Sequence, residues 1–117
     1  MNYKELDVWK ESIILVKLGY EQLKNFPKEE TFGLVSQMKR ALISIPSNIA
    51  EGSARNSDKE FVRFLYISLG SLSEVETQMI ISKELNYIDS IEELFSQIVI
   101  VRKLIIGLIK YLKRKNG

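Results

Sequence analysis

The residues that could do chemistry in this chain are carboxylates, hydroxyls and cations, because the sequence contains neither histidine nor cysteine. The usual zinc ligands, the Ser-His and Cys-His catalytic pairs and the helical Glu-x-x-His di-iron motif all need one of those two residues. The lack of cysteine also excludes disulfides and fits a reducing compartment. We therefore expect a protein that is not an enzyme and that holds no cofactor.

Glutamates are the remaining candidates for metal ligands, at positions Glu51, Glu74, Glu76 and Glu84. Oxygen-only sites for magnesium or calcium need several converging carboxylates, and nothing in this spacing makes the four converge. They also lie at helical spacing among cations, which argues against a paired-carboxylate hydrolase. We expect no metal site.

A polar row accompanies an apolar stripe in the segment 34–52. Its members lie three to four residues apart: Gln37, Arg40, Ser44, Ser47 or Asn48, and Glu51, matched further on by Gly70, Ser71, Ser73 and Glu74. Small residues let helices approach closely. We expect a tight contact here, between helices or between subunits, with Glu51 or Glu74 paired with Arg40 or Arg63, because buried charges persist only when paired. The alternative is a ligand pocket at the same row.

Cations gather near the middle of the chain and at its end. The second group runs from Arg102 to Lys115 without an acid. Cations at a helix C-terminus suit the helix dipole and need no partner, whereas the other interpretation is a basic surface that meets phosphate. The candidate residues for binding nucleic acid or a partner are Lys39, Arg40, Arg55, Lys59, Arg63, Lys113, Arg114 and Lys115.

Helices must position all of these residues, since apolar side chains recur at helical spacing throughout. We predict a first helix from Asp7 to about Asn25, with Trp9, Ile13, Val16, Tyr20 and Leu23 on one face. A second begins after Thr31 as N-cap and ends near Gly52. The third begins at a capping box, 57–60, and ends near Asn86 in a left-handed cap; a second capping box, 90–93, begins the fourth.

The short connections predict one all-α domain over residues 1–117, an antiparallel up-down-up-down four-helix bundle. Pro46 lies within the second helix and predicts a kink, with Ser44 and Ser47 able to bond to the freed carbonyls.

The fourth helix is apolar nearly all round. One stripe consists of Leu94, Ile98, Val101, Ile105, Leu108 and Leu112, while Val99, Ile100, Ile106 and Ile109 fall on another face. A helix that is apolar on more than one side is buried on more than one side, so we expect the second group at an oligomer interface. A deeply buried central helix, or scattered exposed aliphatics, is the alternative.

No segment predicts secretion or membrane insertion. The N-terminus lacks a cationic start followed by an apolar run, and the apolar stretch Ile98 to Ile109 is too short to span a bilayer and is broken by Arg102 and Lys103. We expect a cytoplasmic protein with no membrane partner.

Several blocks resemble a known family. The run SQMKRALISIPSNIAEG at 36–52 and the run EFVRFLYISLGSLSEVETQ at 60–78 are similar to the signatures of the 23S ribosomal RNA intervening-sequence protein family, also called four helix bundle proteins. The segments 3–9 and 26–30 fit as well. The resemblance implies an antiparallel four-helix bundle assembled as a homopentamer, with no enzymatic activity. Some members are encoded within insertions in bacterial 23S rRNA genes, and related retroelement accessory subunits contact reverse transcriptase and nucleic acid.

Together these observations predict a non-enzymatic, homo-oligomeric scaffold that binds RNA, DNA or a nucleic-acid-processing protein through basic surfaces. The alternative is a purely structural or protein-interaction module without affinity for nucleic acid.

Overall fold

The computed structural model describes residues 2–116 and contains helices only. Its elements are η1 (Tyr3–Glu5), α1 (Asp7–Leu23), η2 (Lys28–Glu30), α2 (Leu34–Ser53), α3 (Asp58–Glu84) and α4 (Glu92–Asn116), with no strand in that range. The prediction of an all-α chain with four long helices is confirmed.

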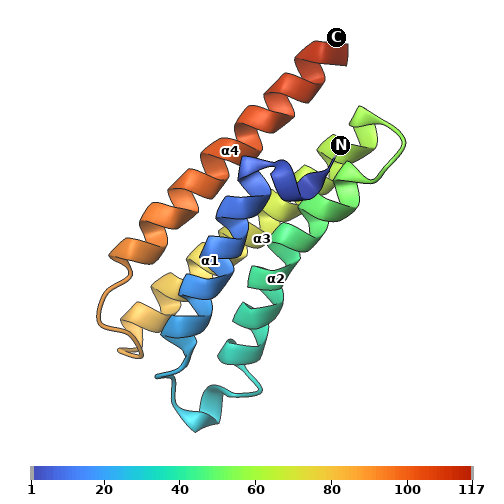
Figure 1. Cartoon of the computed structure of the whole chain (residues 1–117). Coiled ribbons are helices and arrows are strands. Elements are labelled where there is room, and N and C mark those ends of the chain that lie inside the picture. Colours follow the sequence, from blue (N-terminus) through green and yellow to red (C-terminus); the bar gives the residue numbers. More distant parts are fainter. Residues whose placement is uncertain (1, 117) are drawn as a thin grey trace.

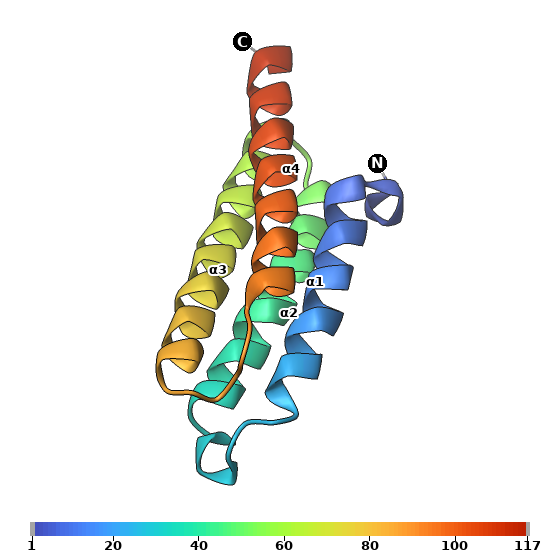
Figure 2. The ribbon, with the colours of Figure 1, turned by 90° about the vertical axis from the view of Figure 1, so that its left-hand side faces the viewer.

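The four long helices form an elongated bundle, 47 × 24 × 20 Å along its principal axes. Each of α1 and α3 contacts both α2 and α4, so the helices follow one another around a shared core. Successive helices run in opposite directions along the long axis (Figure 1). In the turned view of Figure 2, α4 reaches beyond α1 at the end where the chain terminates.

The core side of α1 differs from the predicted stripe. Its buried residues are Val8, Ser12, Leu15, Gly19 and Leu23, whereas Trp9, Ile13, Val16 and Tyr20 are half-buried. Small residues occupy part of the core side because α2 lies close: a Cβ at Gly19 would come within 2.5 Å of Leu42 Cδ1. The larger apolar side chains therefore lie on a flank of α1.

Two predicted helix ends are confirmed. Ser57 is the N-cap of α3, and its Oγ accepts from the amide of Glu60 at 3.2 Å. Asn86 has a φ of 62°, and the following amide, of Tyr87, donates to the carbonyl of Ser82, as in a left-handed helix cap. At the start of α4, Ser90 Oγ accepts from the amide of Glu92 at 3.4 Å.

The predicted start of α2 is wrong. Gly33, rather than Thr31, is the N-cap, and Thr31 ends η2. The reason is Glu30, whose Oε1 accepts from the amide of Leu34 at 3.2 Å while its Oε2 accepts from the Tyr87 hydroxyl at 2.8 Å. One carboxylate thus caps α2 and ties it to the connection between α3 and α4.

Pro46 lies inside α2, and the kink stays a prediction. The sequence predicted that the hydroxyls of Ser44 and Ser47 bond to the carbonyls that Pro46 frees, but within residues 2–116 they do not. Instead Ser44 Oγ is 2.8 Å from Ser71 Oγ, while the carbonyl of Ile45 accepts from Ser68 Oγ of α3 at 2.9 Å. The α3 hydroxyls reach these groups because the two helices pack closely.

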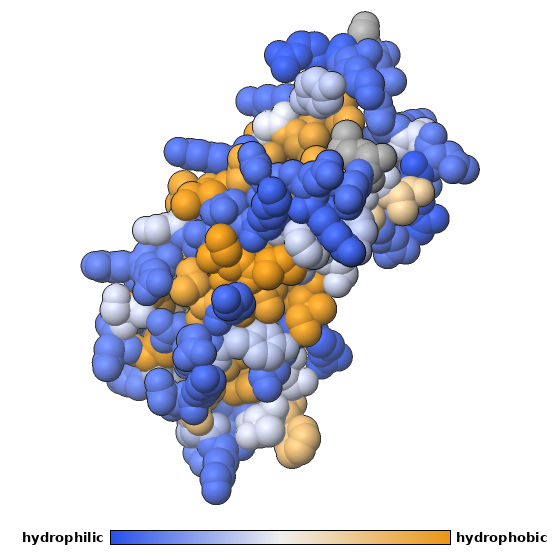
Figure 3. All heavy atoms as spheres, viewed as in Figure 1, coloured by the Kyte–Doolittle hydropathy of each residue, from blue (hydrophilic) through white to orange (hydrophobic). Residues whose placement is uncertain are grey.

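The outer side of α4 is less apolar than predicted. Val99, Ile100 and Ile106 are 44%, 43% and 36% exposed, but Ile109 is 5% exposed and belongs to the core, so it is not available to a partner. Figure 3 shows apolar side chains over the middle of the molecule and hydrophilic ones at the end where α4 terminates. No helix within residues 2–116 is long and apolar enough to cross a membrane.

Candidate nucleic-acid interface

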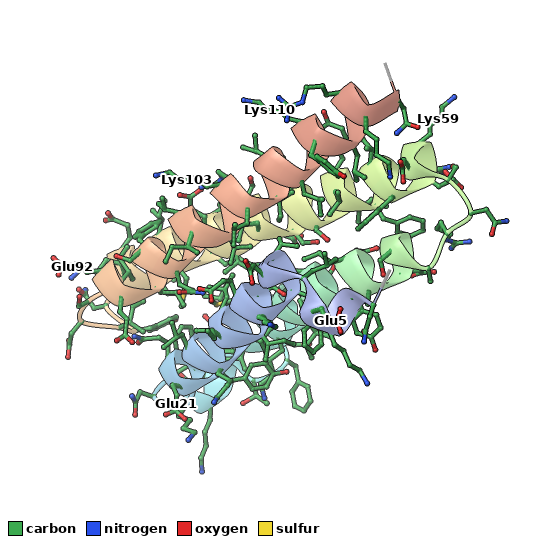
Figure 4. All side chains as sticks on the ribbon, turned by 45° about the horizontal axis from the view of Figure 1, so that its top comes forward. Glu5, Glu21, Lys59, Glu92, Lys103 and Lys110 are labelled. Carbon is green, nitrogen blue, oxygen red and sulfur yellow. The ribbon has the colours of Figure 1, made fainter. Side chains whose placement is uncertain are left out.

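Three helix ends meet at the end of the bundle where the chain terminates. The α2–α3 connection lies there, and Asn116 Nδ2 of α4 donates to Asp58 Oδ2 of α3 at 2.8 Å. This brings together six of the predicted binding residues, which we call the basic end: Arg55, Lys59, Arg63, Lys113, Arg114 and Lys115. Figure 4 shows Lys59 and Lys110 at this end and Glu92 and Glu21 far from it.

The two other predicted binding residues, Lys39 and Arg40, lie in the opposite half of α2. Lys39 Nζ lies over the ring of Tyr20, 5.3 Å from its centroid. The structure therefore separates these two cations from the basic end, and they do not form one surface with it.

The ion pairs differ from those predicted. Glu51 pairs with Arg55 at 2.9 Å, and Arg63 pairs with Glu60 at 3.5 Å, instead of either glutamate of the polar row pairing with Arg40 or Arg63. Neighbours three or four residues apart on one helix lie within reach of each other, and this local proximity prevails over pairing between helices. The Arg63 side chain is 75% exposed, so the pair contributes little stability.

Aromatic rings hold two cations of the basic end. The Arg55 guanidinium lies 4.7 Å from the centroid of Phe64, and Lys113 Nζ lies 5.2 Å from the centroid of Tyr66 and 3.1 Å from its hydroxyl. Such contacts fix a long side chain and leave its charge in place. The basic end therefore has partly ordered cations before any ligand binds.

The acid at the centre of the basic end, Asp58, is a carboxylate paired with a cation. Hydrogen bonding from Asn116, with a further contribution from Lys115 at 3.2 Å, holds the pKa of Asp58 below its ordinary value. Glu51 and Glu60 are each paired with an arginine. In contrast, Lys59, Lys110 and Arg114 make no ion pair with any residue from 2 to 116. Net positive charge is thus left exposed.

One member of the polar row, Ser44, forms a hydrogen bond from α2 to α3. Ser44 contacts Ser71, and Asn48 Nδ2 donates to the carbonyl of Ser44 at 2.8 Å. Ser47 lies elsewhere, on the α1 side of α2 beside Trp9. A shallow hollow of about 450 Å³ remains along the row, lined by Gln37, Arg40, Ala41, Ser44, Ser71 and Glu74.

Acidic residues gather at the opposite end of the bundle. The α1–α2 and α3–α4 connections meet there through the Tyr87–Glu30 hydrogen bond, which raises the pKa of Tyr87 because it favours the neutral phenol. The acids at or beside these connections are Glu21, Glu29, Glu30, Glu84, Asp89, Glu92 and Glu93. No group of three potential metal ligands occurs among the residues that the structure describes.

The family comparison agrees with this architecture. Residues 4–107 match the family model described as 23S rRNA-intervening sequence protein. The chain belongs to this family. No curated protein matches the chain. Among the elements described above, α1, α2 and α3 lie wholly within the family match, whereas the last turns of α4, with Lys110 to Lys115, lie beyond it. The basic end of this 23S rRNA-intervening sequence protein is thus partly outside the matched region.

Three residues beside the basic end are not among the predicted binding residues: Lys110, Tyr66 and Tyr111. Lys110 lies within the acid-free run from Arg102 to Lys115, and the two tyrosines lie on different helices. The structure places Tyr66 beside Lys113, although they are 47 residues apart. Only the antiparallel pairing of α3 with α4 reveals this proximity, so no local signal in the sequence could have identified it.

Proposed function

We propose that this 23S rRNA-intervening sequence protein is a non-enzymatic, oligomeric scaffold that binds nucleic acid through its basic end. The observation that carries the proposal is the convergence of cations from the α2–α3 connection, α3 and α4 at one end of the bundle, where the nearby acids Glu51, Asp58 and Glu60 are already paired with cations. A cluster of cations with little competing negative charge attracts phosphate groups and releases their counterions.

A single copy is a weak ligand for nucleic acid, because its formal net charge is only +2. Assembly multiplies the number of phosphate contacts that one particle can make, and affinity grows with that number. The oligomeric part of the proposal thus explains how a nearly neutral chain gains useful affinity.

Exposed aliphatic side chains on α3 and α4 support assembly. Arg102 of α4 pairs with Glu76 of α3 at 2.8 Å, which fixes the register of the two helices. One turn further along, Ile80 and Val99 take corresponding positions, and both are more than 40% exposed. Ile106 continues this surface on α4, and clustered exposed aliphatics are typical of contact surfaces.

Binding to nucleic acid is tested with a labelled RNA and a labelled DNA over a series of salt concentrations. We expect measurable affinity at low salt that falls as salt rises, since displaced counterions make phosphate contacts salt-dependent. An affinity absent at low salt, or unaffected by salt, would refute this function and favour a protein-interaction module without nucleic-acid affinity.

Assembly is tested by light scattering on the size-fractionated protein. We expect the mass of an oligomer at micromolar concentration, and a monomer for the double variant Val99→Asp/Ile106→Asp. Circular dichroism must show that this variant keeps its helices, and Lys10→Asp, at an exposed position of α1, controls for a change of two charge units outside this surface. A wild-type protein of monomeric mass would end the oligomer proposal.

A further inference from the structure

Three cations and a tyrosine lie side by side around the last turns of α4. Successive residues of an α-helix are about 100° apart, so Lys113, Lys110, Arg114 and Tyr111 follow one another around the outer side of α4 within an arc of about 160°. Tyr66 of α3 extends the arc beyond Lys113, whose Nζ contacts its hydroxyl. The order is therefore one tyrosine, three cations and a second tyrosine.

Both tyrosines are available to a ligand. Tyr66 is 48% exposed and Tyr111 is 49% exposed, although each has an apolar ring that the core could have buried. Lys113 Nζ lies over one side of the Tyr66 ring, and the ring remains half-exposed with this contact in place. Aromatic rings that stay half-exposed beside cations are the arrangement on which proteins stack unpaired bases, because every base offers a π-face.

The helix dipole does not explain all of these cations. Its effect is confined to the last turn, and Lys110 lies nearly two turns before the end of α4 at Asn116. Lys110 and Arg114 also lack ion-pair partners within the range 2–116, so their charge is not used by the fold that the structure describes. Figure 4 shows Lys110 on the outer side of α4.

We infer that the outer surface formed by Tyr66, Lys110, Lys113, Arg114 and Tyr111 binds single-stranded nucleic acid, with the cations on phosphates and the tyrosines stacked on bases. A duplex buries its base faces, so a purely duplex-binding surface would have no use for the two rings. This inference rests on the proposed function and specifies its ligand.

The test compares binding of a labelled oligo(U) strand and an RNA duplex of equal length. We expect tighter binding to the strand. Tyr66→Leu and Tyr111→Leu should each weaken strand binding by about fivefold to a hundredfold, whereas Tyr66→Phe and Tyr111→Phe, which keep the ring, should change it little. The Tyr66→Phe variant also shows whether the hydroxyl contact with Lys113 matters.

The charge arm uses Lys110→Ala/Arg114→Ala and the matched control Lys17→Ala/Lys28→Ala, which removes two exposed cations outside the basic end. For the first double variant, the slope of the logarithm of the binding constant against the logarithm of the salt concentration should become shallower by about 1.4. The control should leave this slope unchanged.

The outcomes separate the two proposals. If the protein binds neither of these RNAs and no DNA either, the proposed function fails. If it binds only duplex DNA, nucleic-acid binding stands and the single-strand inference is wrong. If it binds RNA but prefers the duplex, or the leucine and alanine variants bind the strand as well as the wild type does, nucleic-acid binding stands and this surface is wrong.

Discussion

Gly52 is a position that no other residue can fill without displacing its neighbours. A Cβ there would lie 2.6 Å from Cβ of Phe64 and 2.9 Å from Cδ1 of Phe61. Because the Cβ of Phe64 is fixed to the α3 backbone, we expect Gly52→Ala to lower the free energy of unfolding by about 1–3 kcal/mol. A Cβ at Gly70 would meet no atom of the described residues within 4 Å beyond its own helical neighbours, so Gly70→Ala should raise the same quantity by up to about 1 kcal/mol. Urea denaturation measures the change in the free energy of unfolding for both variants. The same change in both would contradict this prediction.

Two buried glutamines offer a second contrast. Gln78 Oε1 is buried without a hydrogen-bond partner in the described structure, whereas Gln97 Nε2 donates to the carbonyl of Glu11 at 2.8 Å. An unsatisfied buried acceptor carries a desolvation penalty, so Gln78→Met should raise the free energy of unfolding by about 1 kcal/mol. Gln97→Met should instead lower it by about 1 kcal/mol. Thermal melts of the two variants would count against this account if Gln78→Met melted lower than the wild type.

At the scale of elements, Asp58 joins the start of α3 to the end of α4. The pKa of its carboxyl is lowered below 3.8, so its stabilising effect is complete above pH 3.8 and is lost as pH falls through the lowered pKa. We expect wild type to melt higher than Asp58→Asn near neutral pH and the gap to narrow on acidification below 3.8. A melting-temperature difference that stays constant with pH would show that the ionised carboxylate is not responsible.

Sequence predicted the elements where the deciding interactions are local. The N-cap at Ser57 and the left-handed cap at Asn86 involve atoms within a few residues, and both were predictable. The start of α2 was not, because Glu30 takes a capping role that Thr31 was expected to fill, and a hydroxyl 57 residues away holds Glu30 in place.

The candidate site was predictable only in part for the same reason. The sequence identified most cations of the basic end, because a run of cations without acids can be recognised from the sequence alone. Their pairing was wrong at Arg63, and the helix-four face was wrong at Ile109, which is buried together with Ile105 and Leu112 of the predicted core stripe. Which side of a helix faces its neighbours depends on packing with distant segments, and helical spacing alone does not determine it.

At the scale of the whole molecule, charge is divided along the 47 Å axis. The helix connections near Glu30 collect acids, and the basic end collects cations, so the bundle carries a lengthwise charge asymmetry that its net charge of +2 conceals. Antiparallel helices produce this division because the ends of distant segments are brought together. Attraction between the protein and a charged partner should therefore depend on which end of the bundle faces that partner, as well as on the net charge.

This lengthwise asymmetry has a consequence for stoichiometry. In a closed ring of identical copies, rotation about the ring axis keeps every copy in the same axial direction, so all basic ends that lie along that axis emerge on one face. A single nucleic-acid strand running across that face would contact several copies at once. We expect one strand per assembly, and sedimentation of the saturated complex measures the ratio. One strand per chain would show that each copy binds alone.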